Sequence, residues 1–294
     1  MSHILGIGIA TLDRVFVVER FPTEDAEMRA LDHRARPGGN AANSLGVLAQ
    51  LGHRCDLLAV LAAGADGARI GEALAARGID SSACPRRPGA APTSCVLLAQ
   101  DTGSRTIVHH RDLPELDFED FARLPIERYD WLHFEGRNVA VTRRMLQQAR
   151  RRLTDQPLSL EVEKEREDID TLLPLADVLM FSAAFARGRG FDDPATFLPA
   201  MRRRAPRAIL TCTWGEAGAW ALSADDRSLH APAFAPPAVV DTLGAGDCFN
   251  AGLIDALISG RTLDEALDRA CRLAGRKVGQ MGLDGLTDPP STRA

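Results

Sequence analysis

The feature that most constrains the fold is an alternation of short apolar runs with helical patterns along most of the 294 residues. Runs such as CDLLAVLA, LSLEVE and AILTCTW are nearly continuously apolar, which is typical of strands buried on both faces of a parallel sheet. Between them, NSLGVLAQLG and VTRRMLQQARRRL repeat apolar residues at helical spacing. This alternation predicts an α/β protein: a three-layer α/β/α sandwich with a mostly parallel central sheet.

Two segments break the alternation and predict a small β-sheet lid. Residues 14–36 hold two strand-like pieces with no helix between them, and residues 94–111 form a hairpin pattern with DTGS at its turn. The main domain is then expected to comprise residues 1–13, 37–93 and 112–294.

The predicted lid carries apolar side chains that are expected to lie on an exposed face. These are Val15, Val17, Phe21 and Ile107. An exposed apolar face favours a partner over water, so the pattern predicts a homodimer through the lid.

Composition excludes several classes of function. The net charge of -5 does not favour binding to nucleic acid or to an anionic membrane. No stretch approaches the roughly 18 apolar residues that a membrane span needs. The six cysteines are scattered without a CxxC pair, which favours free thiols in a reducing compartment. We therefore expect a cytoplasmic protein that acts on small molecules.

The stretch DTLGAGDCFNAG, residues 241–252, follows an apolar run and leads into a helical pattern. A helix N-terminus offers unpaired N–H groups, and glycines let an anion approach the backbone closely. A phosphate would suit this cradle, and Asp247 in the first turn could accept a proton from a hydroxyl nucleophile. The alternative is that Asp247 only caps the helix.

A second stretch, RPGGNAANSLGVLAQLG, residues 36–52, also places glycines before a helix. Asn40 and Asn43 are three residues apart, so they share one helix face. Amides both donate and accept hydrogen bonds, which suits a polyhydroxylated ligand. N-capping by Asn40 is the structural alternative, and Asp13 and Asp25 could equally be ordinary turn aspartates.

Two nucleotide motifs are incomplete or missing. GIGIAT, residues 6–11, lacks the third glycine of the dinucleotide fingerprint, which disfavours an NAD-dependent oxidoreductase. No GxxxxGK[ST] is present, so a P-loop does not hold the nucleotide.

Together, DTLGAGDCFNAG and RPGGNAANSLGVLAQLG resemble the two signatures of the ribokinase-like (PfkB) carbohydrate kinases, in the family's order and about 200 residues apart. Within the family, GSRTIVHHRDLPELDFEDF, WLHFEGRN and AGRKVGQMGLDG resemble the ketohexokinases. The resemblance implies ATP-dependent phosphorylation of a sugar hydroxyl, with the 1-hydroxyl of D-fructose as the first candidate. It also implies Mg²⁺ with ATP, with K⁺ as a further candidate ion.

The resemblance also implies roles for individual residues. Asp247 would be the catalytic base, and the amides of Gly244, Ala245 and Gly246 would form the anion hole. The sugar would be bound by Asp13, Gly39, Asn40 and Asn43, and by Asp25 reaching across into a partner subunit. The expected nucleotide or phosphate neighbours are Arg105, Arg137, Glu216, Gly218, Pro236, Pro237 and Asn250.

The sequence departs from the family pattern at the metal motif NxxE, where FSAAF offers Ser182 and Phe185. Mg²⁺ would then be held by water and by Glu161 or Glu163. Cys248, beside the expected base, is expected to pack against the sheet.

Other acceptors stay open: ribose, fructose 6-phosphate, 2-keto-3-deoxygluconate, a nucleoside or a glycosyl-amino acid. A non-catalytic sugar or nucleotide sensor on the same fold is a further alternative, which the presence of Asp247 disfavours.

Overall fold

The fold is built on a central sheet of nine strands. The computed structural model describes residues 1–287, so residues 288–294 of the predicted main domain lie outside the described part. The strand order is β15-β14-β13-β12-β11-β10-β1-β4-β6, and pairing is parallel except at β13-β14 and β14-β15. The strands are β1 His3–Ile7, β4 Arg54–Leu58, β6 Ile79–Asp80, β10 Trp131–Glu135, β11 Leu158–Val162, β12 Val178–Ser182, β13 Ile209–Thr213, β14 Ala219–Leu222 and β15 Ser228–Ala231.

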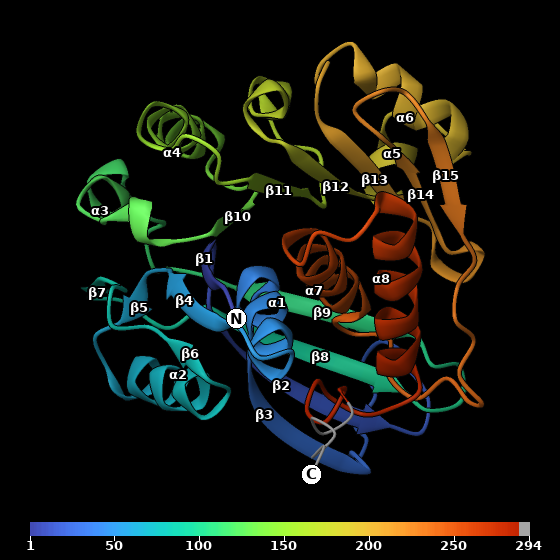
Figure 1. Cartoon of the computed structure of the whole chain (residues 1–294). Helices are drawn as coiled ribbons and strands as arrows, with labels where there is room; N and C mark the ends of the chain where they lie inside the picture. The colour runs from blue at the N-terminus through green and yellow to red at the C-terminus, as the bar shows by residue number, and fades with distance from the viewer. Residues whose placement is uncertain (288–294) are drawn as a thin grey trace, which may run out of the picture.

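Helices cover both faces of this sheet and produce the predicted three layers (Figure 1). Helices α1, α7 and α8 lie on one face, and α4, α5 and α6 lie on the other. The helices are α1 Asn40–Gln50, α2 Ala65–Ala76, α3 Phe118–Ala122, α4 Val139–Arg152, α5 Ala183–Gly188, α6 Pro194–Arg202, α7 Ala245–Ile258 and α8 Leu263–Val278. Helix α7 is buried along most of its length because it packs between α1 and α8.

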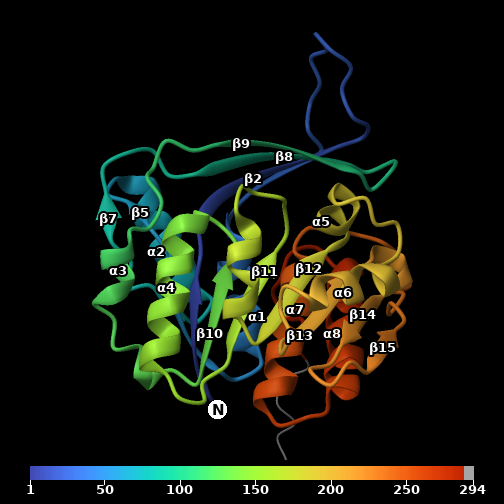
Figure 2. The ribbon, with the colours of Figure 1, turned by 90° about the horizontal axis from the view of Figure 1, so that it is seen from above.

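Four strands form the predicted small sheet, in the order β3-β2-β8-β9. They are β2 Thr11–Val18, β3 Asp32–Gly38, β8 Thr93–Ala99 and β9 Arg105–His110. Figure 2 shows this sheet lying across one end of the sandwich, with the loop between β2 and β3 projecting away from the body. A separate two-stranded ladder joins β5 Leu61–Ala62 to β7 Arg86–Arg87. We call the four-stranded sheet the lid.

The prediction for the apolar face of the lid was wrong for two of its four residues. Val15 is buried with Val96 and Leu98, and Val17 packs against the same cluster, so both face the body of the protein. Register explains this, because Val15 pairs with Val96 and Val17 with Leu98, which places them on one side of the pleat.

The outer side of the lid instead carries the alternate residues of the same strands. Phe16 is half-buried beside Leu97, and Val108 on β9 is 68% exposed. Phe21, in the projecting loop, is exposed as predicted, and Ile107 is partly exposed but lines the cleft beneath the lid. The sequence pattern correctly indicated a half-exposed sheet, but the pleat decides which side chains are outside.

Among the described residues, none of the helices combines the length and hydrophobicity needed to cross a membrane.

Candidate active site

A cleft of about 660 Å³ lies between the lid and the carboxyl ends of the parallel strands. Ligands of open α/β sheets bind at this edge, because every parallel strand delivers its following loop there. The cleft gathers most of the residues predicted from the two motifs and from the lid. These are Asp13, Gly39, Asn40, Asn43, Arg105, Arg137, Gly244, Gly246, Asp247 and Asn250.

Asp247 lies in the first turn of α7, which begins after Gly244. Gly244 has φ of 87°, a left-handed conformation that glycine adopts without strain, and it turns the chain into the helix. The Asp247 side chain is 7% exposed, and Asn43 Nδ2 donates a 2.8 Å hydrogen bond to its Oδ2.

The pKa of Asp247 is raised to about 8. Burial is the main cause, while the Asn43 hydrogen bond acts in the opposite direction and the Glu135, Glu163 and Asp13 carboxylates add to the increase. A carboxyl group with a raised pKa has the proton affinity that a general base needs near neutral pH.

The N-terminus of α1 approaches the site because Gly39 allows it. Its φ is 106°, and a Cβ added there would lie 2.1 Å from the Ile9 carbonyl oxygen. One turn of helix then brings both asparagines to the cleft, as predicted. Asn40 Nδ2 lies 3.2 Å from Glu161 Oε1 and 3.3 Å from Glu163 Oε2, while Asn43 binds Asp247.

Sequence reasoning missed Glu135, which holds this helix terminus in place. Its buried Oε1 accepts hydrogen bonds from the backbone N–H of Ala41 at 2.8 Å and of Ile9 at 3.3 Å. Burial raises its pKa, against the effect of these hydrogen bonds and of Arg137. A charged residue at the carboxyl end of a buried parallel strand was the available signal.

Glu161 supplies the feature that fits a metal ion. Its Oε2 is buried and has no hydrogen-bond partner among residues 1–287, and the side chain lines the cleft. Burial, then the nearby Asp247 and Glu135, raise its pKa well above the usual value. A cation that arrives with a nucleotide would relieve this repulsion. The described part of the chain contains no group of three or more His, Cys, Asp or Glu side chains arranged to hold a metal alone.

The FSAAF segment contributes structural hydrogen bonds through Ser182. Ser182 caps α5 by accepting a hydrogen bond from the Phe185 backbone N–H, and its hydroxyl donates to the Glu163 carbonyl. Cys248 is fully buried, and burial raises its pKa, which agrees with the prediction that it packs.

A second cavity of about 570 Å³ adjoins the cleft and is lined mainly by apolar residues. Of the predicted nucleotide neighbours, it contains Glu216, Gly218 and Pro236, together with Ala245 and Gly246 of the predicted anion hole. Arg105, Thr242 and Gly246 line both spaces, and Arg105 Nη1 donates a 2.6 Å hydrogen bond to Thr242 Oγ1. The two spaces therefore share lining residues at the N-terminus of α7, where Asp247 lies.

Two of the predicted nucleotide neighbours lie outside the second cavity: Asn250 lines the cleft, and Pro237 lines neither space. Asp25 is exposed in the projecting loop, outside both spaces of this chain, so its predicted role in the site of a partner subunit stays a prediction.

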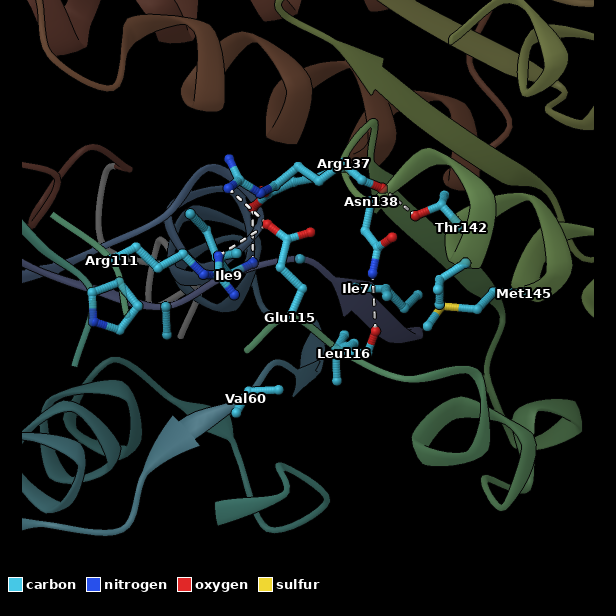
Figure 3. Close-up of a pocket in the computed structure, with 15 residues that line it drawn as sticks. Ile7, Ile9, Val60, Arg111, Glu115, Leu116, Arg137, Asn138, Thr142 and Met145 are labelled. Carbon is cyan, nitrogen blue, oxygen red and sulfur yellow. Dashed lines mark hydrogen bonds and ion pairs between the residues drawn. The ribbon is translucent and has the colours of Figure 1, made fainter. Parts of the chain in front are cut away.

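Arg137 lines the cleft and also a small cavity next to it. Arg137 Nη2 pairs with Glu115 Oε1 at 3.0 Å, and Arg111 Nη1 meets the same carboxylate at 3.1 Å (Figure 3). Arg111 directly follows β9, so this cluster ties the end of the lid to β10. Arg137 is therefore engaged in a structural ion pair as well as lining the cleft.

Comparisons with known proteins agree with this geometry. The chain matches the pfkB family of carbohydrate kinases over residues 1–288. It is 39% identical to ketohexokinase from Mus musculus, covering 97% of this chain and 99% of that protein. It is 26% identical to the fructosamine kinase FrlD of Bacillus subtilis (strain 168), covering 86% and 87%.

Among solved structures, a putative ribokinase from Agrobacterium tumefaciens superposes with a TM-score of 0.85 at 26% identity, covering 96% of this chain and 92% of that one. The whole-length family match and the 39% identical relative establish that this chain belongs to the pfkB family and is an ATP-dependent carbohydrate kinase.

Proposed function

We propose that this kinase transfers the γ-phosphate of ATP to the 1-hydroxyl of D-fructose and forms fructose 1-phosphate. The observation that carries the proposal is the buried Asp247 carboxylate, which faces the cleft at the N-terminus of α7 beside a second cavity suited to a nucleotide. Fructose is favoured over other acceptors by the 39% identity with a ketohexokinase across nearly the whole chain.

In the proposed mechanism, Asp247 accepts the proton of the attacking sugar hydroxyl as the new P–O bond forms. The bond between the γ-phosphorus and the bridging oxygen breaks, and ADP leaves with that oxygen. The backbone N–H groups of Gly244, Ala245 and Gly246 stabilise charge on the transferring phosphoryl oxygens. Mg²⁺ would supply further charge neutralisation, with Glu161 as the side chain best placed to hold it or its water.

In this proposal, the polar groups around Asp247 bind and orient the sugar. Asp13 accepts a 2.8 Å hydrogen bond from Thr11 Oγ1, which fixes its carboxylate in the cleft. Asn40 and Asn43 are held by carboxylates, so their amide oxygens are free to accept from sugar hydroxyls. Positioning of this kind lowers the barrier by converting a bimolecular encounter into an oriented reaction.

We also propose that the lid forms the interface of a homodimer. Phe16, Leu97 and Val108 form an apolar outer face, and the loop that carries Asp25 projects beyond the body. Pairing of two such faces would cover the apolar side chains and bring Asp25 to the sugar site of the partner. The proposed location is the cytoplasm, and the proposed partners include neither nucleic acid nor a membrane.

A panel of acceptors tests the proposal directly. ADP release is measured with fructose, ribose, 2-keto-3-deoxygluconate, fructose 6-phosphate, a nucleoside and a glycosyl-amino acid at matched concentrations. Fructose should have the highest kcat/KM, and product analysis should locate the phosphate on C1. Fructose 6-phosphate is an informative competitor because Arg36, Arg137 and Arg166 line the cleft. A higher kcat/KM with any other acceptor would refute fructose as the substrate.

A further inference from the structure

Lysine is rare in this chain, and one of its lysines is completely buried. Of 35 Lys and Arg residues only Lys164 and Lys277 are lysine, so 35 − 2 = 33 are arginine. The Lys164 side chain is 65% exposed, whereas the Lys277 side chain is 0% exposed. A buried charge is costly unless it is paired and hydrogen-bonded, so this position needs a specific reason for an ammonium group.

The Lys277 ammonium group is surrounded by oxygen atoms from two segments. Its Nζ lies 2.9 Å from Asp241 Oδ2, 2.8 Å from the Asp241 carbonyl oxygen and 3.3 Å from the Gln280 carbonyl oxygen. Three donors thus meet three oxygen acceptors, which satisfies the hydrogen-bonding capacity of an ammonium group. The compact ammonium of lysine suits three converging acceptors better than the planar fork of a guanidinium does.

Asp241 transmits this contact to the loop before α7. Its Oδ1 accepts from the Leu243 backbone N–H at 2.9 Å, and its Oδ2 accepts from the Gly282 N–H at 3.2 Å. Burial alone would raise the pKa of Asp241, but pairing with Lys277 and the hydrogen bonds from the Leu243 and Gly282 N–H groups together lower it. The carboxylate therefore stays charged and fixes the turn that ends at Gly244.

The same loop also contacts the lid. Leu243 of this loop, together with Met281 after α8, packs against the cluster of Val15, Val96 and Leu98 on the inner side of the lid. Arg36, on β3, places Nη2 3.7 Å from Asp241 Oδ2. The Lys277–Asp241 pair consequently stands where the lid, the end of α8 and the start of α7 meet.

A potassium ion does not fit beside Asp241 in this structure. The oxygens that could coordinate it already surround Lys277 Nζ at hydrogen-bond distances. The side chain thus supplies one positive charge in an all-oxygen environment, as a bound monovalent ion would.

We propose that Lys277 is a positioning residue that serves as a built-in monovalent cation, holding Asp241 and the Thr242–Gly244 turn in the geometry that the anion hole requires. The inference rests on the assignment of the Gly244–Gly246 amides to the transferring phosphoryl group. Preorganised donors stabilise a transition state more than a ground state, so a looser turn reduces kcat more than it raises either KM.

Two variants test this inference with the best acceptor of the panel. Lys277→Met removes the cation, and the double variant Lys277→Met/Asp241→Asn also removes the charge that would be left unpaired, which protects folding. Both should bind ATP within about threefold of the parent, and kcat should fall at least about tenfold, because the turn loses its anchor.

Arg269→Met is the matched control. Arg269 lies on the same helix and pairs with the largely buried Asp255 at 2.8 Å, away from the cleft, so only its melting temperature should fall.

Chemical rescue provides a readout that a merely structural role would not give. In Lys277→Ala, ammonium chloride should restore kcat severalfold, whereas tetramethylammonium chloride at equal ionic strength should not, because only the smaller ion fits the vacated cage. The inference is overturned if the folded double variant keeps kcat within threefold of the parent, or if the two salts act alike. Asp247→Asn serves as the reference: if it retains turnover, the site assignment itself fails, and that result is distinct from a failure at Lys277.

Discussion

Asn43 and Asp247 are 204 positions apart in the chain, yet the Asn43 amide donates a 2.8 Å hydrogen bond to the Asp247 carboxylate. The bond joins α1 to α7 at the cleft and connects the two sequence motifs physically. It also opposes the effect of burial on the Asp247 pKa. One contact therefore unites sugar positioning with the tuning of the proposed base.

Replacement of Asp247 by Asn should abolish nearly all turnover. The substitution keeps the shape and removes the proton acceptor, and a positioned general base contributes about 10²- to 10⁴-fold to rate. ATP affinity should stay within severalfold, as measured by titration. Asp66→Asn, on the exposed first turn of α2, is the matched control and should retain full kcat. Full activity in Asp247→Asn would contradict the base assignment.

Replacement of Asn43 by Ala should move the acidic limb of the kcat profile to higher pH. The Asn43 hydrogen bond lowers the Asp247 pKa, so its loss raises that pKa further and leaves less of the base deprotonated at neutral pH. The sugar KM should also rise more than the ATP KM. Asn40→Ala should raise the sugar KM without shifting the limb, because Asn40 bonds Glu161 and Glu163 and not Asp247.

The parent enzyme should itself show an acidic limb displaced upward from ordinary carboxylates. Burial raises the pKa of Asp247, so protonation removes the base as pH falls through that raised value, and activity returns as pH rises. Bound Mg²⁺ and ATP alter the local charge, so kcat/KM for the sugar is the profile to measure. A limb at the pKa of an unperturbed aspartate, near 4, would argue against a buried base.

Glu135 should behave as a support for the N-terminus of α1. Glu135→Ala leaves the buried Ala41 N–H without its acceptor, which costs about 1–3 kcal/mol of unfolding free energy. The sugar KM should increase because Asn40 and Asn43 follow this terminus. Glu135→Gln keeps an acceptor oxygen and should lose much less, as denaturant titration and kinetics can show. Equal losses in the two variants would mean that the charge matters more than the hydrogen bond.

A charge on the outer side of the lid should prevent dimer formation. Val108→Glu places a carboxylate within the proposed apolar interface, whereas Thr102→Glu changes the exposed hairpin tip outside the lid strands. Sedimentation should show monomer only for Val108→Glu, with reduced activity if Asp25 serves the partner's site. A parent protein that is monomeric at micromolar concentration would remove this part of the proposal.

Sequence alone determined the features of this protein that depend on local pattern. The run of apolar strands and amphipathic helices predicted the α/β sandwich because periodicity and burial are linked directly. The DTLGAGD pattern predicted a helix N-terminus with Asp247 in its first turn, since a helix N-terminus is a local structure, and its use as a phosphate cradle stays a prediction. The asparagine spacing of α1 likewise placed both amides on one face.

Tertiary structure alone decided features that depend on register and on contacts distant in sequence. Strand pairing, not the apolar pattern, decided that Val15 faces inward and Val108 outward. Only the packing of the parallel strands showed that Glu135 holds α1 and that one oxygen of Glu161, Oε2, has no hydrogen-bond partner within residues 1–287. Lys277 lies in a stretch that the sequence singled out only by family resemblance, and the role proposed for it follows from its contacts with Asp241, 36 residues away. The environment of a buried charge is set by residues that are distant in sequence, and the sequence pattern does not show which residues these are.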